Sequence, residues 1–363
     1  MSSIEKLTEI PSARENRVLQ KARTEAQSRR QELDLLLRRE MGPSSDDSYD
    51  SVDTSLVVFG SLAREEWTSG SDLDWTYLID GQVNSDHLVI AQKIDSVLKE
   101  HKHRFPVPGP TGIFGNMAFS HDIVHQIGGQ SDTNKNTTQR ILLLLESAAV
   151  GKGKQAYERV LRAVINRYLE EDNHLLTEDE QSYRVPRFLL NDIVRFWRTM
   201  AVDFASKQRD RGGDGWGLRN AKLRMSRKLI FASGLLLCFG CNLDADLKKK
   251  ISTEKNAIKL NLVNHIREWV RLTPLEIVAR SLAAYSVPKR VNEDFFSSYA
   301  AFLDLLDNPD SRKKLQNLRA VDSRNDPDFK KVKEISRIFE SSLDYIFFEN
   351  NELKSLTRKY AVF

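Results

Sequence analysis

Two short apolar runs of β-type residues constrain the fold of this chain more than any other feature. They are Ser55–Phe59 (S-L-V-V-F) and Leu73–Ile79 (L-D-W-T-Y-L-I), and turn residues follow each of them. Apolar residues then recur at helical spacing over His87–Lys99, and a loop rich in Pro and Gly covers Pro106–Gly115. This order predicts a small α/β unit: strand, helix or turn, strand, helix and loop.

The remainder of the chain has helical character. The charged segment Ser12–Met41 carries leucines at helical spacing, which predicts a surface or lid helix. Nearly all of the chain after residue 151 shows the same periodicity. We therefore expect an α+β fold, with a small mixed sheet followed by a helical domain. The expected parts are an N-terminal helix in residues 1–45, the sheet domain in residues 46–150 and the helical domain in residues 151–363.

Composition limits the classes of function. A net charge of +4 over 363 residues gives no general basicity that would indicate a nucleic-acid binder. The N-terminus, M-S-S-I-E-K-L-T-E-I, has acidic residues and no apolar centre, so we expect no secretory signal there.

The longest apolar segment, Leu229–Cys241, is shorter than the roughly 20 residues of a membrane span and predicts a buried helix, with no membrane partner. It contains the only two cysteines, Cys238 and Cys241. Core packing is favoured for them over half of a zinc site, because no second pair of ligands lies nearby. A reducing, cytoplasmic location fits such cysteine usage.

Asp72 and Asp74 lie one residue apart at the start of the second apolar run. Side chains at i and i+2 of a strand point to the same face, so the two carboxylates are expected to be close neighbours. Such a pair repels unless a cation binds both, and Mg²⁺ prefers carboxylate oxygens. The alternative is a solvated turn with no metal.

Gly60-Ser61 follows the first apolar run. Glycine permits close approach of the backbone, and the following N–H groups together with the serine hydroxyl can bind phosphate oxygens. Taken with the aspartate pair, this spacing predicts a triphosphate held between hydrogen-bond donors on one side and metal ions on the other.

The stretch G-S-L-A-R-E-E-W-T-S-G-S-D-L-D resembles the signature of the DNA polymerase β-like nucleotidyltransferase superfamily. It is most similar to the catalytic domains of bacterial PII-protein uridylyltransferase and glutamine-synthetase adenylyltransferase. Glu65 occupies the position of a usual glycine. The residues that match the pattern are Gly60, Ser61, Arg64, Glu66, Ser71, Asp72 and Asp74.

The resemblance implies two Mg²⁺ ions bridged by Asp72 and Asp74, and a third carboxylate from a later strand. Glu146, in R-I-L-L-L-L-E-S-A-A-V-G, is the favoured third ligand, although Ala148 stands where an arginine is expected. Asp122, in F-S-H-D-I-V, is the rival. The catalytic and metal-binding set is thus Asp72, Asp74 and Glu146, and the expected nucleotide is ATP or UTP.

Four nucleotide contacts are expected near the motif, from Gly60, Ser61, Arg64 and Ser71, and two more are expected from the helical domain. Arg195 belongs to a polar stripe on one predicted helix, and Lys222 to a basic stretch that follows a glycine-rich loop. Solvated helix faces are the alternative for both.

The resemblance implies a Mg²⁺-dependent bacterial enzyme that transfers an NMP from an NTP to an acceptor hydroxyl and releases pyrophosphate. The motif handles the nucleotide only, so the acceptor stays open. A protein side chain is favoured by analogy, ahead of an RNA or tRNA end and of a cyclic-oligonucleotide synthase of a bacterial defence system. An inactive nucleotide-binding regulatory module is the alternative of another class.

Overall fold

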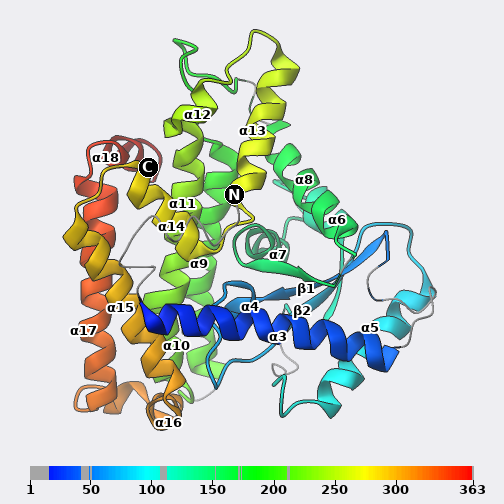
Figure 1. The fold of residues 1–363 in the computed structure, drawn as a ribbon, viewed down its shortest axis with the longest axis vertical. Coiled ribbons are helices and arrows are strands. Elements are labelled where there is room, and N and C mark those ends of the chain that lie inside the picture. Colours follow the sequence, from blue (N-terminus) through cyan, green and yellow to red (C-terminus); the bar gives the residue numbers. More distant parts are fainter. Residues whose placement is uncertain are drawn as a thin grey trace. The chain divides into compact units, whose positions relative to one another are not determined.

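The structure is a computed structural model that describes residues 16–41, 49, 51–106, 113–151, 153–170, 172, 174–210 and 213–361. It combines many helices with one small mixed sheet (Figure 1), which confirms the predicted α+β class. The chain divides into two compact units. Unit 1 comprises residues 1–21, 68–70 and 172–363, and unit 2 comprises residues 22–67 and 71–171.

The sheet of unit 2 has four strands in the order β3-β2-β1-β4. The strands are β1 (Thr54–Phe59), β2 (Asp74–Ile79), β3 (Asn116–Phe119) and β4 (Ser147–Val150). β1 is antiparallel to both of its neighbours, whereas β3 runs parallel to β2. The two strands predicted from the apolar runs are confirmed as β1 and β2, which are adjacent in the sheet.

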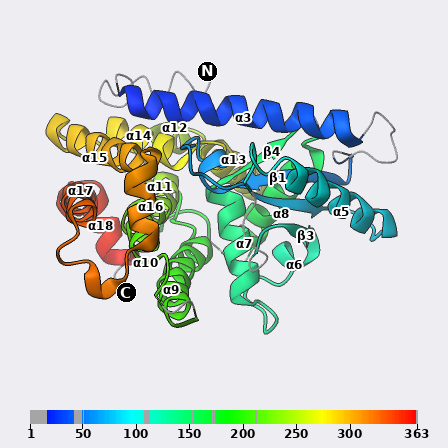
Figure 2. The ribbon, with the colours of Figure 1, turned by 90° about the horizontal axis from the view of Figure 1, so that it is seen from below.

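Helices cover both faces of this sheet. They are α3 (Arg17–Met41), α4 (Gly60–Ala63), α5 (Ser85–Glu100), α6 (Ser120–Val124), α7 (Asn134–Leu145) and α8 (Gln155–Glu170). Leu56, Val58 and Trp75 pack with α3 and α5, and the alternate residues Val57 and Thr76 line a cavity with α6 and α7. Figure 2 shows α3 on one side of the strands and α6 and α7 on the other.

The helix that the sequence predicts over His87–Lys99 is α5, and local chemistry explains where it begins. Asn84 is its N-cap, and a capping box joins the Asn84 and His87 side chains to each other's backbone. Its buried face consists of residues at helical spacing, Ile90, Ala91, Ile94, Val97 and Leu98. The leucines that recur at helical spacing in α3, Leu19, Leu33, Leu36 and Leu37, are buried, whereas Leu35 is exposed.

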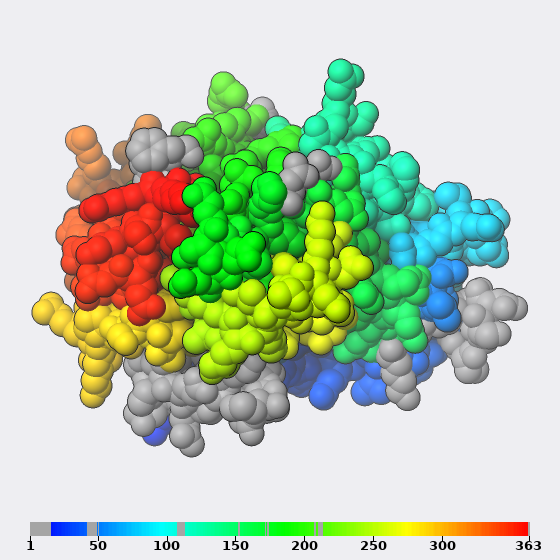
Figure 3. Space-filling view, turned by 90° about the horizontal axis from the view of Figure 1, so that it is seen from above, coloured from blue at the N-terminus to red at the C-terminus, as the bar shows by residue number. Residues whose placement is uncertain are grey.

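Unit 1 is helical. Its longer helices are α9 (Arg187–Asp210), α11 (Lys228–Leu243), α13 (Lys255–Trp269), α14 (Pro274–Ala284), α15 (Lys289–Asp307), α16 (Pro309–Asn317) and α17 (Pro327–Asp344). Its shorter elements are α10 (Trp216–Lys222), η1 (Leu223–Arg227), α12 (Ala245–Lys248), η2 (Ala320–Asp322), η3 (Tyr345–Glu349), α18 (Leu353–Leu356) and η4 (Thr357–Ala361). The C-terminal turns, red in Figure 3, form part of its surface.

The apolar segment Leu229–Cys241 is a buried helix, as predicted, because it lies within α11 and nearly all of its residues are buried. Both cysteines are fully buried free thiols, and burial raises their pKa well above its usual range. The core-packing interpretation of these residues is confirmed. The helical segment Trp216–Lys248 is long and apolar enough to cross a membrane, but 67% of its most apolar window is buried, as is typical of a core helix.

The compact units differ from the domain boundaries expected from the sequence, 1–45, 46–150 and 151–363. Most of α3 belongs to the same unit as the sheet, because its apolar face packs on β1 and β2. α8 also contacts β1, which extends this unit to residue 171. Thr68–Gly70 belongs to unit 1, although the residues on either side of it belong to unit 2.

His265 makes the stability of unit 1 sensitive to pH. It is 7% exposed and packs against the Trp269 ring. Burial is the main cause that lowers its pKa to about 4; Asp244 opposes this shift, and Arg280 and Lys250 contribute to it. Above about pH 4 the imidazole is therefore neutral in the folded state. Because the unfolded chain already binds a proton below about pH 6.5, the free energy of unfolding falls as pH falls from about 6.5 toward 4. We expect a loss of about 3 kcal/mol in unfolding free energy from this group.

The measurement is urea unfolding at pH 7.5 and pH 4, followed in unit 1 by peptide-resolved hydrogen exchange. His265→Gln should reduce the pH dependence, and His174→Gln, at an exposed histidine of the same unit, should leave it unchanged. An equal pH dependence in wild type and His265→Gln would contradict the assignment.

Candidate active site

Three features of the predicted site lie at one end of the sheet. Asp74 is the first residue of β2 and is paired with Phe59, the last residue of β1. Phe59 is also paired with Ser147, the first residue of β4. Gly60 directly follows Phe59, and Glu146 directly precedes Ser147. The strand register therefore brings the phosphate turn, Asp74 and Glu146 to the same sheet edge.

Gly60 is fitted closely to Asp74. Its φ of +66° is in the left-handed region, and a Cβ at this position would lie 2.9 Å from Asp74 Oδ2. Ser61, which is half-buried, is the second residue of the single turn α4. Glycine adopts this φ without strain and leaves room for the Asp74 carboxylate, which is a physical reason for glycine at position 60.

Asp72 and Asp74 differ in their secondary structure. The expectation that both lie on one strand is wrong, because β2 begins at Asp74 and Asp72 precedes it. Leu73, between them, is fully buried, and its N–H donates to the Pro106 carbonyl at 2.7 Å. Both aspartates are half-buried. The anchored Leu73 fixes the backbone between the two carboxylates at the rim of the sheet.

Arg64 joins two buried glutamates at this edge. Its Nε donates to Glu66 Oε2 at 2.8 Å, and its Nη1 pairs with Glu146 Oε2. The side chain of Glu66 is 1% exposed and that of Glu146 is 3% exposed. Both ion pairs of Arg64 are thus buried, and its single positive charge compensates part of the negative charge of the two desolvated carboxylates.

Glu146 is not on a strand. The apolar run before it, Ile141–Leu145, forms the last turns of α7, and Glu146 is the C-cap of that helix. The resemblance implied a carboxylate on a later strand. In the structure that strand, β4, begins one residue later, at Ser147.

The donor set fits Mg²⁺ in part. Two half-buried carboxylates beside a glycine turn are the hard oxygen ligands that this ion prefers, and the space beside Asp74 exists only because residue 60 lacks a Cβ. Across the described residues, no three His, Cys, Asp or Glu side chains form a metal-binding group. Glu146 is held by Arg64 instead. The pair Asp72 and Asp74 therefore fits the metal, and Glu146 as third ligand stays a prediction.

Asp122, the rival third ligand, is at the other end of the sheet. It lies on α6, which directly follows β3, and Phe119 at the end of β3 is paired with Ile79 at the end of β2. Asp74 begins the six-residue strand β2 and Ile79 ends it, so the two lie at opposite ends of the strand. The Asp122 side chain is exposed and accepts a hydrogen bond from Gln126. This placement favours Glu146 over Asp122.

Glu65, which replaces a usual glycine, has a φ of +60°, a conformation that glycine adopts without strain. Its carboxylate is bound by three side chains of α3: Arg23 at 2.9 Å, Gln27 at 3.2 Å and Arg30. The contact of α3 with this turn was not among the predictions from the sequence. The available signal was the spacing of these residues at i, i+4 and i+7, which places them on one face of a helix.

The remaining predicted residues lie in different units. Ser71 is buried in unit 2, immediately before Asp72. Arg195 on α9 and Lys222 on α10 are half-buried residues of unit 1. Their contact with a nucleotide bound by the residues of unit 2 stays a prediction.

Replacing Gly60 by alanine is expected to weaken metal binding and transfer at least tenfold. The new Cβ would displace the Asp74 carboxylate, and the positive φ would cost about 1–2 kcal/mol of stability. Gly128→Ala is the matched control, because Gly128 has a φ of +73° with nothing within 4 Å of the added Cβ. We expect both variants to lose stability in thermal unfolding and only Gly60→Ala to lose Mn²⁺ affinity. Equal Mn²⁺ affinities would contradict the role of Gly60.

Comparison with known proteins agrees with this geometry. Residues 45–105 match the family described as Nucleotidyltransferase domain. The match covers β1 to α5, including Gly60, Ser61, Asp72 and Asp74, and it ends before Glu146. No protein of curated function matches the chain significantly. The domain match supports a transferase of phosphorus-containing groups that uses an NTP and transfers an NMP.

Proposed function

We propose that this chain is a Mg²⁺-dependent nucleotidyltransferase that transfers an NMP from an NTP, ATP or UTP, to a hydroxyl of an acceptor protein. The observation that carries the proposal is the common sheet edge at which Gly60-Ser61 and Asp74 meet. The similarity of the motif to the PII-uridylyltransferase and glutamine-synthetase adenylyltransferase type favours a protein acceptor. We also propose a cytoplasmic location, in keeping with two buried free thiols.

The proposed residues have distinct tasks. The backbone N–H groups after Gly60 and the Ser61 hydroxyl bind phosphate oxygens, and Asp72 and Asp74 hold the metal. Mg²⁺ held by these two carboxylates would supply positive charge for the triphosphate and would lower the pKa of the attacking hydroxyl. The acceptor hydroxyl loses its proton to solvent, and its oxygen bonds to the α-phosphorus. The bond from that phosphorus to the bridging oxygen of the β-phosphate breaks, so pyrophosphate leaves. Arg64 holds Glu66 and Glu146 at the same edge.

One observation favours a second candidate function. Glu146 is paired with Arg64, and the described part of the chain has no three-residue metal group. An inactive module that binds a nucleotide through the same turn would have these properties. The two candidates differ in chemistry rather than in nucleotide binding.

The test is incubation of the whole protein with each α-³²P-labelled NTP, Mg²⁺ and total cell protein and RNA. Wild type is expected to label protein, and the double variant Asp72→Asn/Asp74→Asn is expected to label nothing. Label on RNA, or in a small cyclic product, would overturn the protein acceptor and keep the transferase. Nucleotide binding by wild type without any transfer would establish the inactive module.

A further inference from the structure

The segment Thr68–Gly70 joins the two halves of the nucleotidyltransferase motif, yet it packs with unit 1. It follows the turn that begins at Gly60 and precedes Asp72 by two residues. The residues on either side of it belong to unit 2. A segment that packs with unit 1 therefore ends only two residues before Asp72.

Ser69 and Gly70 are bound at the corner between α15 and α16. The Ser69 N–H donates to Asp307 Oδ1 at 2.8 Å, and the Ser69 hydroxyl donates to the Asp307 carbonyl at 2.9 Å. The Arg312 guanidinium donates to the Gly70 carbonyl. We call Ser69, Gly70, Asp307 and Arg312 the loop anchor.

The corner that supplies the loop anchor is well defined. Asp307 is the last residue of α15, and Asn308 caps the start of α16 by accepting from the Ser311 N–H. Pro309 takes the first helical position, where it is favoured. The Asp307 carboxylate also accepts from Lys21 at 2.7 Å, and Arg312 is 9% exposed. Both partners of the loop are therefore fixed by their own surroundings.

Gly70 has no room for a side chain. A Cβ at this position would overlap the Arg312 guanidinium. Only Ser71 separates Gly70 from Asp72, and each residue of chain spans at most about 3.6 Å. A displacement of Gly70 is therefore transmitted to Asp72 over a short segment with little slack.

We propose that Asp307 and Arg312 are positioning residues for the metal-binding pair Asp72 and Asp74, acting through the loop anchor. This inference rests on the proposed function, because the pair is a metal site only if the transferase proposal holds. The loop anchor gives the helical unit a direct influence on the geometry of the two carboxylates. A shift of the α15–α16 corner alters metal affinity without any change in the site residues themselves.

The experiment compares Asp307→Ala and Gly70→Ala with wild type in the full-length protein. Mn²⁺ binding is followed by electron paramagnetic resonance, and hydrogen exchange is followed in peptides that span residues 66–75. We expect Mn²⁺ affinity to fall about tenfold and exchange of the segment to rise about tenfold in both variants. Asp307→Asn retains an acceptor oxygen for the Ser69 N–H and should restore most of the affinity.

Glu293→Ala is the matched control, because Glu293 lies on α15 in an exposed pair with Lys289. It should change neither readout. Transfer by Asp307→Ala should recover at saturating metal, which a general loss of folding would not allow. Wild-type Mn²⁺ affinity in both anchor variants would overturn the inference while leaving the proposed function intact. A wild-type protein that neither binds Mn²⁺ nor transfers an NMP would overturn both.

Discussion

Asp74→Asn is expected to lower the rate of NMP transfer about 10³-fold. Asp74 is the carboxylate that directly faces the glycine turn, so its loss removes metal charge from the place where the phosphates are expected. A bound metal contributes several kcal/mol to stabilisation of the transition state, and each 1.36 kcal/mol is a factor of ten in rate. Pyrophosphate release from labelled NTP measures the effect, with Asp72→Asn expected to be similarly impaired.

The same substitution is expected to raise the stability of the metal-free protein. Asp72 and Asp74 are two residues apart, and their like charges repel when no cation is bound. Asp74→Asn is therefore expected to raise the thermal midpoint in the presence of a chelator and to abolish the further rise that Mg²⁺ and NTP produce in wild type. A lowered midpoint with chelator would show that Asp74 is a structural carboxylate.

Two further variants separate the rival third ligands. Glu146→Gln is expected to lower transfer at least 10²-fold, whereas Asp122→Asn, an exposed residue at the opposite sheet end, should retain wild-type transfer. Because Glu146 also pairs with Arg64, Mn²⁺ affinity must be measured together with the rate. A loss confined to Asp122→Asn would exchange the two assignments.

The sequence predicted the parts of the site that depend on local pattern. β1, β2 and α5 have clear alternation or helical spacing, and Gly60 needs a positive φ that the residue type itself indicates. β3 and β4 have only four residues each, too few to show alternation. The apolar run before Glu146 belongs to a helix that the sequence did not reveal. All of Ile141–Leu145 is buried, so no polar face marks the helical period.

The parts that the sequence did not predict depend on contacts between distant residues. Glu65 pairs with Arg30, 35 positions earlier, and Gly70 with Arg312, 242 positions later. Neither partner has a local pattern that points to the other. The domain boundary expected at residue 45 differs from the compact units for the same reason. The leucine spacing of α3 indicates an apolar face, but not that this face packs on the sheet.

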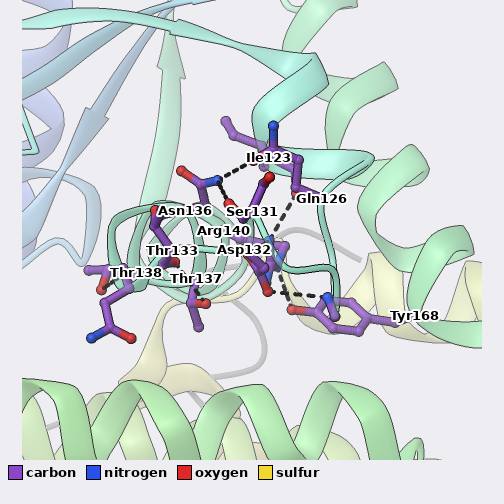
Figure 4. A network of polar contacts seen from close by, with 12 residues as sticks. Ile123, Gln126, Ser131, Asp132, Thr133, Asn136, Thr137, Thr138, Arg140 and Tyr168 are labelled. Atoms are coloured by element: carbon purple, nitrogen blue, oxygen red, sulfur yellow. Dashed lines mark hydrogen bonds and ion pairs between the residues drawn. The ribbon is translucent and has the colours of Figure 1, made fainter.

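Arg140→Met is expected to lower the unfolding free energy of unit 2 by about 3–5 kcal/mol, the cost typical of removing one partner of a buried ion pair. Arg140 on α7 is completely buried. It pairs with both carboxylate oxygens of Asp132 and donates to the Tyr168 hydroxyl at 2.7 Å and to the Ile123 carbonyl at 3.2 Å (Figure 4). Methionine fills similar volume but leaves these groups without their donor.

Asp132 makes this loss larger than a packing defect. Its side chain is 2% exposed and also accepts from the Gly128 N–H at 3.2 Å, so it holds the turn before α7. Without Arg140 the charge of Asp132 stays buried, and the Gly128 N–H that donates to it is a neutral group. Lys99→Met, in the exposed Asp95–Lys99 pair of α5, is the matched control and should cost at most about 0.5–1 kcal/mol.

A double-variant cycle distinguishes loss of the ion pair from loss of packing. Asp132→Asn removes the charge and keeps an acceptor oxygen, so Arg140→Met should cost less in that background than in wild type. We expect a coupling energy of about 1–3 kcal/mol between the two positions, obtained from urea midpoints of unit 2 peptides labelled by pulsed hydrogen exchange. Strictly additive effects would mean that Arg140 stabilises α7 through packing and its bonds to Tyr168 and Ile123 alone. The coupled result is expected because both oxygens of Asp132 are directed at the guanidinium, which makes the pair the centre of the network rather than one contact among several.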